Sequence, residues 1–127
     1  MIWRYIGEGE LHMAGTTVPL DTAIEQARQF ISAHLSEPLT LTLIAEAAAV
    51  SPPHLVRLFR SHLHTTPMAY LWERRVAMGI ELLRQTGLSV GEIAQRCGFL
   101  TSHHFSRRVR LATGLAPLEV RQQAWEY

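Results

Sequence analysis

The chain of 127 residues contains an internal repeat, and this repeat limits the possible folds more than any other feature. Residues 44–50 resemble residues 93–99 at an offset of 49, and residues 51–67 resemble residues 101–117 at an offset of 50, after one inserted residue. The clearest matched pairs are Ile44 with Ile93, Ala45 with Ala94, Ser51 with Thr101, His54 with His104, Leu55 with Phe105, Arg57 with Arg107, Arg60 with Arg110 and Pro67 with Pro117. A repeat of this length predicts that one small structural unit occurs twice.

Each copy has the pattern of a helix-turn-helix. A short helix ends in small residues, Ala48 and Ala49 in the first copy and Cys97 and Gly98 in the second, which lets a following helix pack at a steep angle. Polar residues begin that second helix, and an arginine comes about six positions later. Gly98 suits the tight turn because glycine tolerates a positive φ, whereas Ala49 is less permissive. In this motif the N-terminal face of the second helix enters the major groove of DNA.

Capping and periodicity signals predict helices from Asp21 onward. Asp21 is expected to cap a helix with the apolar stripe Ile24, Ala27, Ile31 and Leu35, ending before Pro38. Further helices are expected over residues 41–48 after Thr40, from Ser51-Pro52 to Leu63, from Thr66-Pro67 to Gln85, from the capping box of Ser89 and Glu92 to Arg96, from Thr101 to Leu111, and from Ala116-Pro117.

These signals predict an all-α, homeodomain-like fold of about seven helices, with two tandem helix-turn-helix subdomains joined by a long linker helix. The expected parts are an N-terminal arm or interdomain linker over residues 1–20, a first subdomain over 21–65, the linker helix over 66–86 and a second subdomain over 87–127. A helix of about 20 residues is roughly 30 Å long. Successive major grooves on one side of B-DNA are about 34 Å apart, so one chain could read two adjacent grooves.

Composition excludes several classes of protein. No apolar run approaches the roughly 18 residues that span a bilayer, the N-terminus lacks the pattern of a signal peptide, and Cys97 is the only cysteine. We therefore expect a protein of the reducing cytoplasm, without membrane contact. No carboxylate pair, catalytic triad or phosphate loop occurs, so neither an enzyme nor a bound cofactor is predicted. All 12 basic residues are arginine, but the net charge is only +1, so DNA binding depends on where the arginines lie.

Several residues allow a second interpretation. His103 and His104 with nearby Cys97 could suggest a metal site, but adjacent helical residues point apart and no zinc spacing is present. Cys97 aligns with Ala48 and is expected to be a small buried residue. A role at the helix edge and a DNA contact are both open for His104. Trp3, Tyr5 and Trp125 could pack together or on a partner.

The second copy carries the most specific motif: residues 93–99 (IAQRCGF), 104–107 (HFSR) and 114–117 (GLAP), followed by Arg121. With residues 44–59 of the first copy, this motif resembles the AraC/XylS family of bacterial transcription regulators, and the resemblance covers about Ala23 to Arg121. It implies a seven-helix DNA-binding domain whose third and sixth helices enter neighbouring major grooves of duplex DNA, at the nucleoid. It also implies recruitment or obstruction of RNA polymerase, and allows a missing N-terminal effector domain.

The resemblance implies two sets of DNA-facing residues. In the first unit they are Ser51, Pro53, His54, Val56, Arg57 and Arg60, and in the second unit Thr101, Ser102, His103, Ser106, Arg107 and Arg110. Pro53 and Val56 can contact only apolar groups such as thymine methyls, so the first helix is expected to specify few bases.

The sequence departs from the family pattern at four positions. Val109 stands for a phenylalanine, Val120 for a tyrosine, His64 for a glycine and Gly79 for an alanine. Gly79 is expected to weaken the linker helix by about 1 kcal/mol and to let it bend. These departures and the low net charge leave an alternative open: a helical protein-interaction module that has this fold but has lost DNA affinity.

Overall fold

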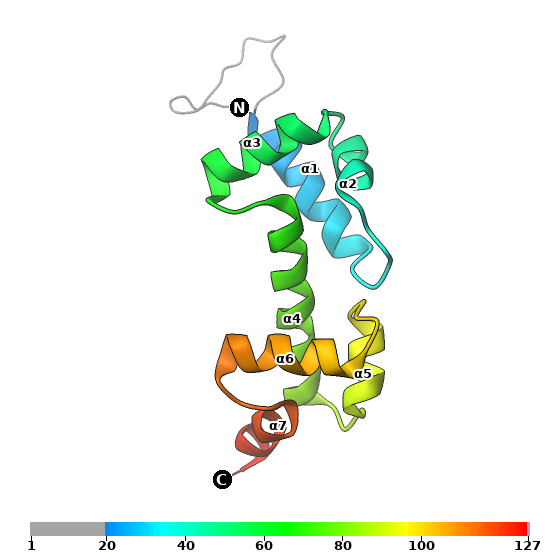
Figure 1. Ribbon diagram of the computed structural model, residues 1–127, viewed down its shortest axis with the longest axis vertical. Helices are drawn as coiled ribbons and strands as arrows, with labels where there is room; N and C mark the ends of the chain where they lie inside the picture. The colour runs from blue at the N-terminus through cyan, green and yellow to red at the C-terminus, as the bar shows by residue number, and fades with distance from the viewer. Residues whose placement is uncertain (1–19, 127) are drawn as a thin grey trace. The chain divides into compact units, whose positions relative to one another are not determined.

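The computed structural model describes residues 20–126, which form seven α-helices and no strand (Figure 1). The helices are α1 (Leu20–Ala33), α2 (Leu41–Ala47), α3 (Pro52–Leu63), α4 (Pro67–Gln85), α5 (Val90–Arg96), α6 (Ser102–Thr113) and α7 (Pro117–Trp125). The predicted all-α fold of about seven helices is confirmed. The proposed arm, with Trp3 and Tyr5, lies outside the described residues.

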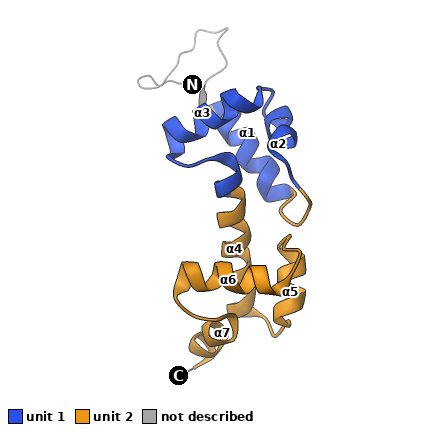
Figure 2. Ribbon diagram, in the orientation of Figure 1, with its two compact units in different colours: residues 1–33, 39–70 blue, residues 34–38, 71–127 orange. Residues whose placement is uncertain are grey.

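The chain divides into two compact units (Figure 2). Of the described residues, 20–33 and 39–70 belong to unit 1, and 34–38 and 71–126 belong to unit 2. In unit 1, α1 packs against α2 and α3, which also pack against each other. In unit 2, α6 packs against α5 and α7. Each unit therefore has a helix-turn-helix, α2–α3 or α5–α6, supported by a further helix.

Helix starts follow the predicted caps. The side-chain oxygens of four N-cap residues accept a hydrogen bond from a backbone N–H three residues later; these caps are Thr40, Ser51, Ser89 and Thr101. Glu92 returns the bond of Ser89 by accepting from the Ser89 N–H at 2.9 Å, which completes the expected capping box. The prediction for Asp21 is wrong, because α1 begins one residue earlier, at Leu20. Leu35 was also predicted to lie in this helix, but α1 ends two residues before it, at Ala33.

The turns of the two units share one hydrogen-bond pattern. The Val50 N–H donates to the Ala45 carbonyl at 3.1 Å, and the Phe99 N–H donates to the Ala94 carbonyl at 2.9 Å. Between these residues the backbone is left-handed in both copies, with φ of 59° at Ala49 and 88° at Gly98. The repeat in sequence is thus a repeat in backbone conformation.

A second matched position lies at the C-terminal ends of α3 and α6. His64 ends α3 with φ of 57°, and Gly114 ends α6 with φ of 79°. A left-handed conformation costs an L-residue with a side chain roughly 1–2 kcal/mol, and glycine avoids this cost. Unit 1 therefore holds strained residues at two positions where unit 2 has glycine.

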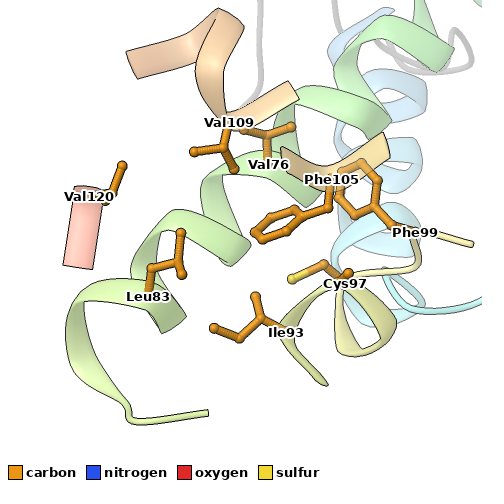
Figure 3. Packing of buried hydrophobic residues seen from close by; sticks show 9 residues of the cluster. Val76, Leu83, Ile93, Cys97, Phe99, Phe105, Val109 and Val120 are labelled. Carbon is orange, nitrogen blue, oxygen red and sulfur yellow. The ribbon is translucent and has the colours of Figure 1, made fainter. Parts of the chain in front are cut away.

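The core of unit 2 gathers around Phe105 of α6, which lies among residues of α4, α5 and α7 (Figure 3). Its ring lies against Gly79, where an added Cβ would come within 2.7 Å of the Phe105 Cζ atom. Gly79 thus provides the space for this ring, a role that the expectation of a weak point in α4 missed. Val109 and Val120, which replace aromatic residues of the family pattern, are both buried in the same core.

Candidate nucleic-acid interface

Helix α3 presents one face to the core of unit 1 and another to solvent. Leu55, Leu58 and Phe59 are buried, whereas Pro53, Arg57 and Arg60 are exposed at spacings of four and three residues. Residues at such spacings line one side of a helix. Of the other predicted DNA-facing residues, Ser51 is exposed at the N-cap, and His54 and Val56 are half-buried.

Helix α6 repeats this arrangement at an offset of 50. Phe105 and Val109 are buried, and His103, Arg107 and Arg110 form the exposed stripe that matches Pro53, Arg57 and Arg60. Thr101 and Ser102 are exposed at the start of the helix, and Ser106 is half-buried. Each unit thus brings its own set of predicted residues together around the N-terminal part and one face of a recognition helix.

The arginines of both stripes form no ion pair with a carboxylate within residues 20–126. No acidic residue occurs between Glu46 and Glu73 or between Glu92 and Glu119, the two segments that contain α3 and α6. Among the described residues, the two ion pairs are Arg28 with Glu25 and His34 with Glu37, so no carboxylate neutralises a stripe arginine. The net charge of +1 is therefore compatible with two local basic segments, one on α3 and one on α6. The low net charge does not argue against nucleic-acid binding by these segments.

A buried arginine of α4, Arg75, binds the segment that follows α1 within unit 2. Arg75 is 4% exposed, and it donates from Nε to the Leu35 carbonyl at 2.9 Å and from Nη2 to the Glu37 carbonyl at 2.6 Å. Its guanidinium lies 4.5 Å from the ring centre of Trp72, and burial lowers the pKa of Arg75. Sequence reasoning missed this role, although Arg75 lies four residues after Leu71 and eight before Leu83, on the predicted buried face of α4, whereas Arg74 is exposed.

Arg121 makes a second tie of the same kind. It donates from Nε to the Leu83 carbonyl at 3.1 Å and from Nη2 to the Leu88 carbonyl at 2.6 Å. Its guanidinium lies 5.4 Å from the ring centre of Trp125, whose Nε1 donates to the Arg84 carbonyl at 2.7 Å. The C-terminal helix α7 is thereby fastened to the end of α4 and to the segment that leads into α5.

The two neighbouring histidines of α6 have different surroundings. His103 is exposed, whereas the half-buried His104 lies with its ring centre 5.1 Å from that of Trp72 and 5.2 Å from that of Phe99. This packing favours the structural role for His104 over the DNA contact. Within residues 20–126, no three His, Cys, Asp or Glu side chains are grouped so that they could hold a metal ion.

Cys97 is fully buried, as its alignment with Ala48 predicted. Burial raises the pKa of its thiol to about 11, and the positive charge of Arg75 opposes this shift to a smaller extent. A thiol with this pKa is protonated at neutral pH and is a poor nucleophile.

Arg108 lies away from the exposed stripe of α6. Together with Glu73, Val76, Ile80 and Leu111 it lines a largely apolar groove of about 450 Å³ between α4 and α6. Unit 2 therefore has a basic stripe and an apolar groove on different parts of α6.

Comparison with known families decides the class. A family model described as a helix-turn-helix domain matches residues 44–123, which run from the second half of α2 through α3 to α6 and into most of α7. The regulator GbdR of Pseudomonas aeruginosa is 36% identical over 111 residues, which are 87% of this chain and 29% of GbdR. The activator RhaS of an Enterobacter species is 34% identical over 102 residues, or 80% of this chain and 37% of RhaS.

The chain belongs to the AraC family of helix-turn-helix transcription regulators.

Solved AraC-type structures superpose on most of this chain. An AraC-type regulator from Chromobacterium violaceum superposes with a TM-score of 0.79 at 34% identity, covering 84% of this chain and 95% of that one. The DNA-binding domain of AdpA, solved in complex with a target DNA, gives a TM-score of 0.74 at 28% identity over 80% of this chain and 91% of that domain. The present AraC-type chain spans less than two fifths of the length of GbdR and RhaS.

None of the described helices of this AraC-type chain is both long and apolar enough to cross a membrane.

Proposed function

We propose that the chain binds duplex DNA as a transcription regulator, with α3 and α6 each reading one half of a bipartite site in the major groove. The supporting observation is the exposed stripe that occurs at matched positions on both helices: Pro53, Arg57 and Arg60 on α3, and His103, Arg107 and Arg110 on α6. Arginine forms bidentate bonds with the O6 and N7 atoms of guanine and also pairs with phosphates, and no carboxylate in the described part of the chain forms an ion pair with these arginines.

The N-cap residues are assigned a different task. Ser51 and Thr101 use their side-chain oxygens to cap α3 and α6. Backbone and hydroxyl contacts to phosphates fix the register of a protein on the duplex without reading sequence. We assign Ser51, Thr101 and Ser102 to such positioning contacts. The residues assigned to the base edges are those of the two exposed stripes, together with His54, Val56 and Ser106.

Selection from a pool of random duplex DNA at moderate salt, followed by sequencing, tests this function. The expected result is a bipartite motif with half-sites about one helical turn, or roughly 10 base pairs, apart. Replacement of Arg57, Arg60, Arg107 and Arg110 by alanine should abolish enrichment. A matched variant with alanine at the exposed Arg74 and Arg84 loses two arginines outside α3 and α6 and should retain the motif.

A helical protein-interaction module is the second candidate, and the apolar groove favours it. Leu111 at this groove is 80% exposed, and Val76 and Ile80 form its walls. If the purified chain binds no DNA at any salt concentration, the groove becomes the primary site. Salt-sensitive binding without a motif would instead indicate a non-specific DNA binder.

The proposal extends to the rest of the regulatory event. RNA polymerase is the proposed partner of the DNA-bound chain, and an effector domain is proposed on its N-terminal side because GbdR is much longer than the matched segment. The nucleoid of the cytoplasm is the proposed place of action. A reporter gene placed behind the selected motif would reveal whether transcription rises or falls with the chain present.

A further inference from the structure

The connection between α5 and α6 carries a leucine that is almost entirely in solvent. Leu100 is 98% exposed, compared with 80% for Leu111 and 62% for Leu118. A single exposed apolar side chain on a protein surface is common and needs no explanation. The position of Leu100 gives it a meaning, because the next residue, Thr101, is the N-cap of the proposed recognition helix α6.

The backbone on both sides of Leu100 is fixed. Phe99 is 4% exposed, its N–H donates to the Ala94 carbonyl at 2.9 Å, and its ring centre lies 5.2 Å from that of Phe105 (Figure 3). On the other side, Thr101 Oγ1 accepts from the His104 N–H at 3.0 Å. Leu100 is therefore held outward on a rigid support at the start of α6, and ordering it on a ligand costs little backbone entropy.

Leu100 has no counterpart in unit 1. The offset between the two copies changes from 49 to 50 between Val50 and Ser51, and the extra residue in unit 2 is Leu100. The turn itself does not need this residue, since α2 and α3 make the same turn hydrogen bonds without it. The insertion therefore adds an apolar group to the N-terminal end of one recognition helix only.

We propose that Leu100 determines part of the sequence specificity of unit 2 by contacting the 5-methyl group of a thymine in the major groove. This inference rests on the proposed function. Leucine offers only aliphatic C–H groups, and the thymine methyl is the apolar group that base edges present in the major groove. The contact separates thymine from cytosine, which has hydrogen in place of that methyl, at one end of the half-site that α6 reads.

Deoxyuridine tests the contact, because it pairs like thymine and lacks only the methyl group. In the motif selected by the wild-type chain, each thymine of the α6 half-site is replaced in turn. Wild-type affinity should fall about four-fold at one position, which corresponds to roughly 0.8 kcal/mol for one buried methyl group. Leu100→Ser should bind the thymine site about four-fold or more weakly than wild type, and should not distinguish thymine from deoxyuridine there.

Leu118→Ser is the matched control, since Leu118 is also exposed but lies on α7, outside α6 and outside the apolar groove. It should keep both the affinity and the sensitivity to deoxyuridine. Both variants should retain the thermal unfolding temperature of wild type, because neither side chain is in the core. A Leu100→Ser chain that still distinguishes the two bases would overturn the inference.

Two other outcomes separate this inference from the proposed function. An equal loss of Leu100→Ser affinity on all sequences would mean a contact with the sugar–phosphate backbone, and the inference would be wrong while DNA binding stands. A wild-type chain that enriches no motif would contradict the proposed function itself, and the assignment of Leu100 would fall with it.

Discussion

The two helix-turn-helix units make the same turns with different residues. Unit 2 uses glycine at both left-handed positions, Gly98 and Gly114, whereas unit 1 uses Ala49 and His64. Their turn hydrogen bonds nevertheless match. The bond donated by the Val50 N–H is 3.1 Å long, and the corresponding bond donated by the Phe99 N–H is 2.9 Å long. The comparison teaches that the fold specifies a backbone conformation, and that packing in a unit can impose it on a residue that disfavours it.

The comparison is not symmetric, because the glycines are not equally replaceable. A Cβ at Gly98 would lie 2.8 Å from both the Arg75 Nε atom and the Leu35 carbonyl oxygen, whereas a Cβ at Gly114 would meet nothing within 4 Å. The close approach of Arg75 thus makes glycine at position 98 a steric requirement in addition to a conformational preference.

The largest expected effect comes from Gly98→Ala, which places in unit 2 the residue that unit 1 has at Ala49. Left-handed strain and overpacking against Arg75 and the Leu35 carbonyl should together lower the free energy of unfolding by about 2–5 kcal/mol. Chemical denaturation measures this loss. Gly114→Ala is the control for strain alone and should cost only about 1–2 kcal/mol. Equal losses in the two variants would mean that contact with Arg75 contributes nothing.

Arg107→Ala and Arg57→Ala test whether the two recognition stripes act separately. Each should cost about 1–3 kcal/mol of binding to the selected site and relax base preference only in its own half-site. Competition binding with half-site variants measures both effects, and Arg74→Ala serves as the control. We expect the half-site of α3 to tolerate more bases, because Pro53 stands where α6 has His103. A uniform loss on all sequences would reassign the arginine to phosphate contact.

High pH should lower the free energy of unfolding, because the buried thiol of Cys97 loses its proton. The folded thiol has a pKa of about 11, raised by burial from its ordinary value of 9.0. The stability that comes from the proton held in the folded state is therefore complete below about pH 9 and is lost as pH rises through about 11. Over this window the unfolding free energy should fall by about 1–2 kcal/mol more in wild type than in Cys97→Ala. The alanine variant copies Ala48 of unit 1, and identical pH profiles would refute the assignment.

The smallest expected effects are increases in stability. Ala49→Gly and His64→Gly should each raise the free energy of unfolding by about 0.5–1 kcal/mol, because relief of left-handed strain exceeds the added entropy of the unfolded chain. Differential scanning calorimetry of the single and double variants measures the gains and their additivity. A decrease in unfolding temperature for Ala49→Gly would show that its methyl group packs more strongly than its backbone is strained.

Most of the fold could be predicted because its signals are local. The caps at Thr40, Ser51, Ser89 and Thr101 act within one turn of helix, and the repeat required one turn geometry in both units. The predicted start at Asp21 was wrong by one residue, because α1 begins at Leu20. At a helix end, small differences in hydrogen bonding move the boundary by a residue or two.

Contacts between distant segments could not be predicted in the same way. The effect of Gly79 was predicted from helix propensity alone. Its role is to leave space for the ring of Phe105, which lies 26 positions later in the chain. Arg75 was overlooked for the same reason, since its acceptors lie about 40 residues earlier. For the site, the resemblance to the AraC/XylS family implied which residues face DNA, and the structure added their exposure. Their contacts with bases stay a prediction.

The hydrogen bonds of Arg75 and Arg121 have a consequence for altering this protein. All four acceptors are backbone carbonyl oxygens, of Leu35, Glu37, Leu83 and Leu88, and every residue type possesses such an oxygen. The side chains of the acceptor residues can therefore change while the bonds persist, provided that the backbone path is kept and that Leu83, which is buried in the core of unit 2, is retained. An engineer who wishes to graft new loops before α2 or α5 has that freedom, whereas lysine could not replace either arginine, since it lacks the forked donors.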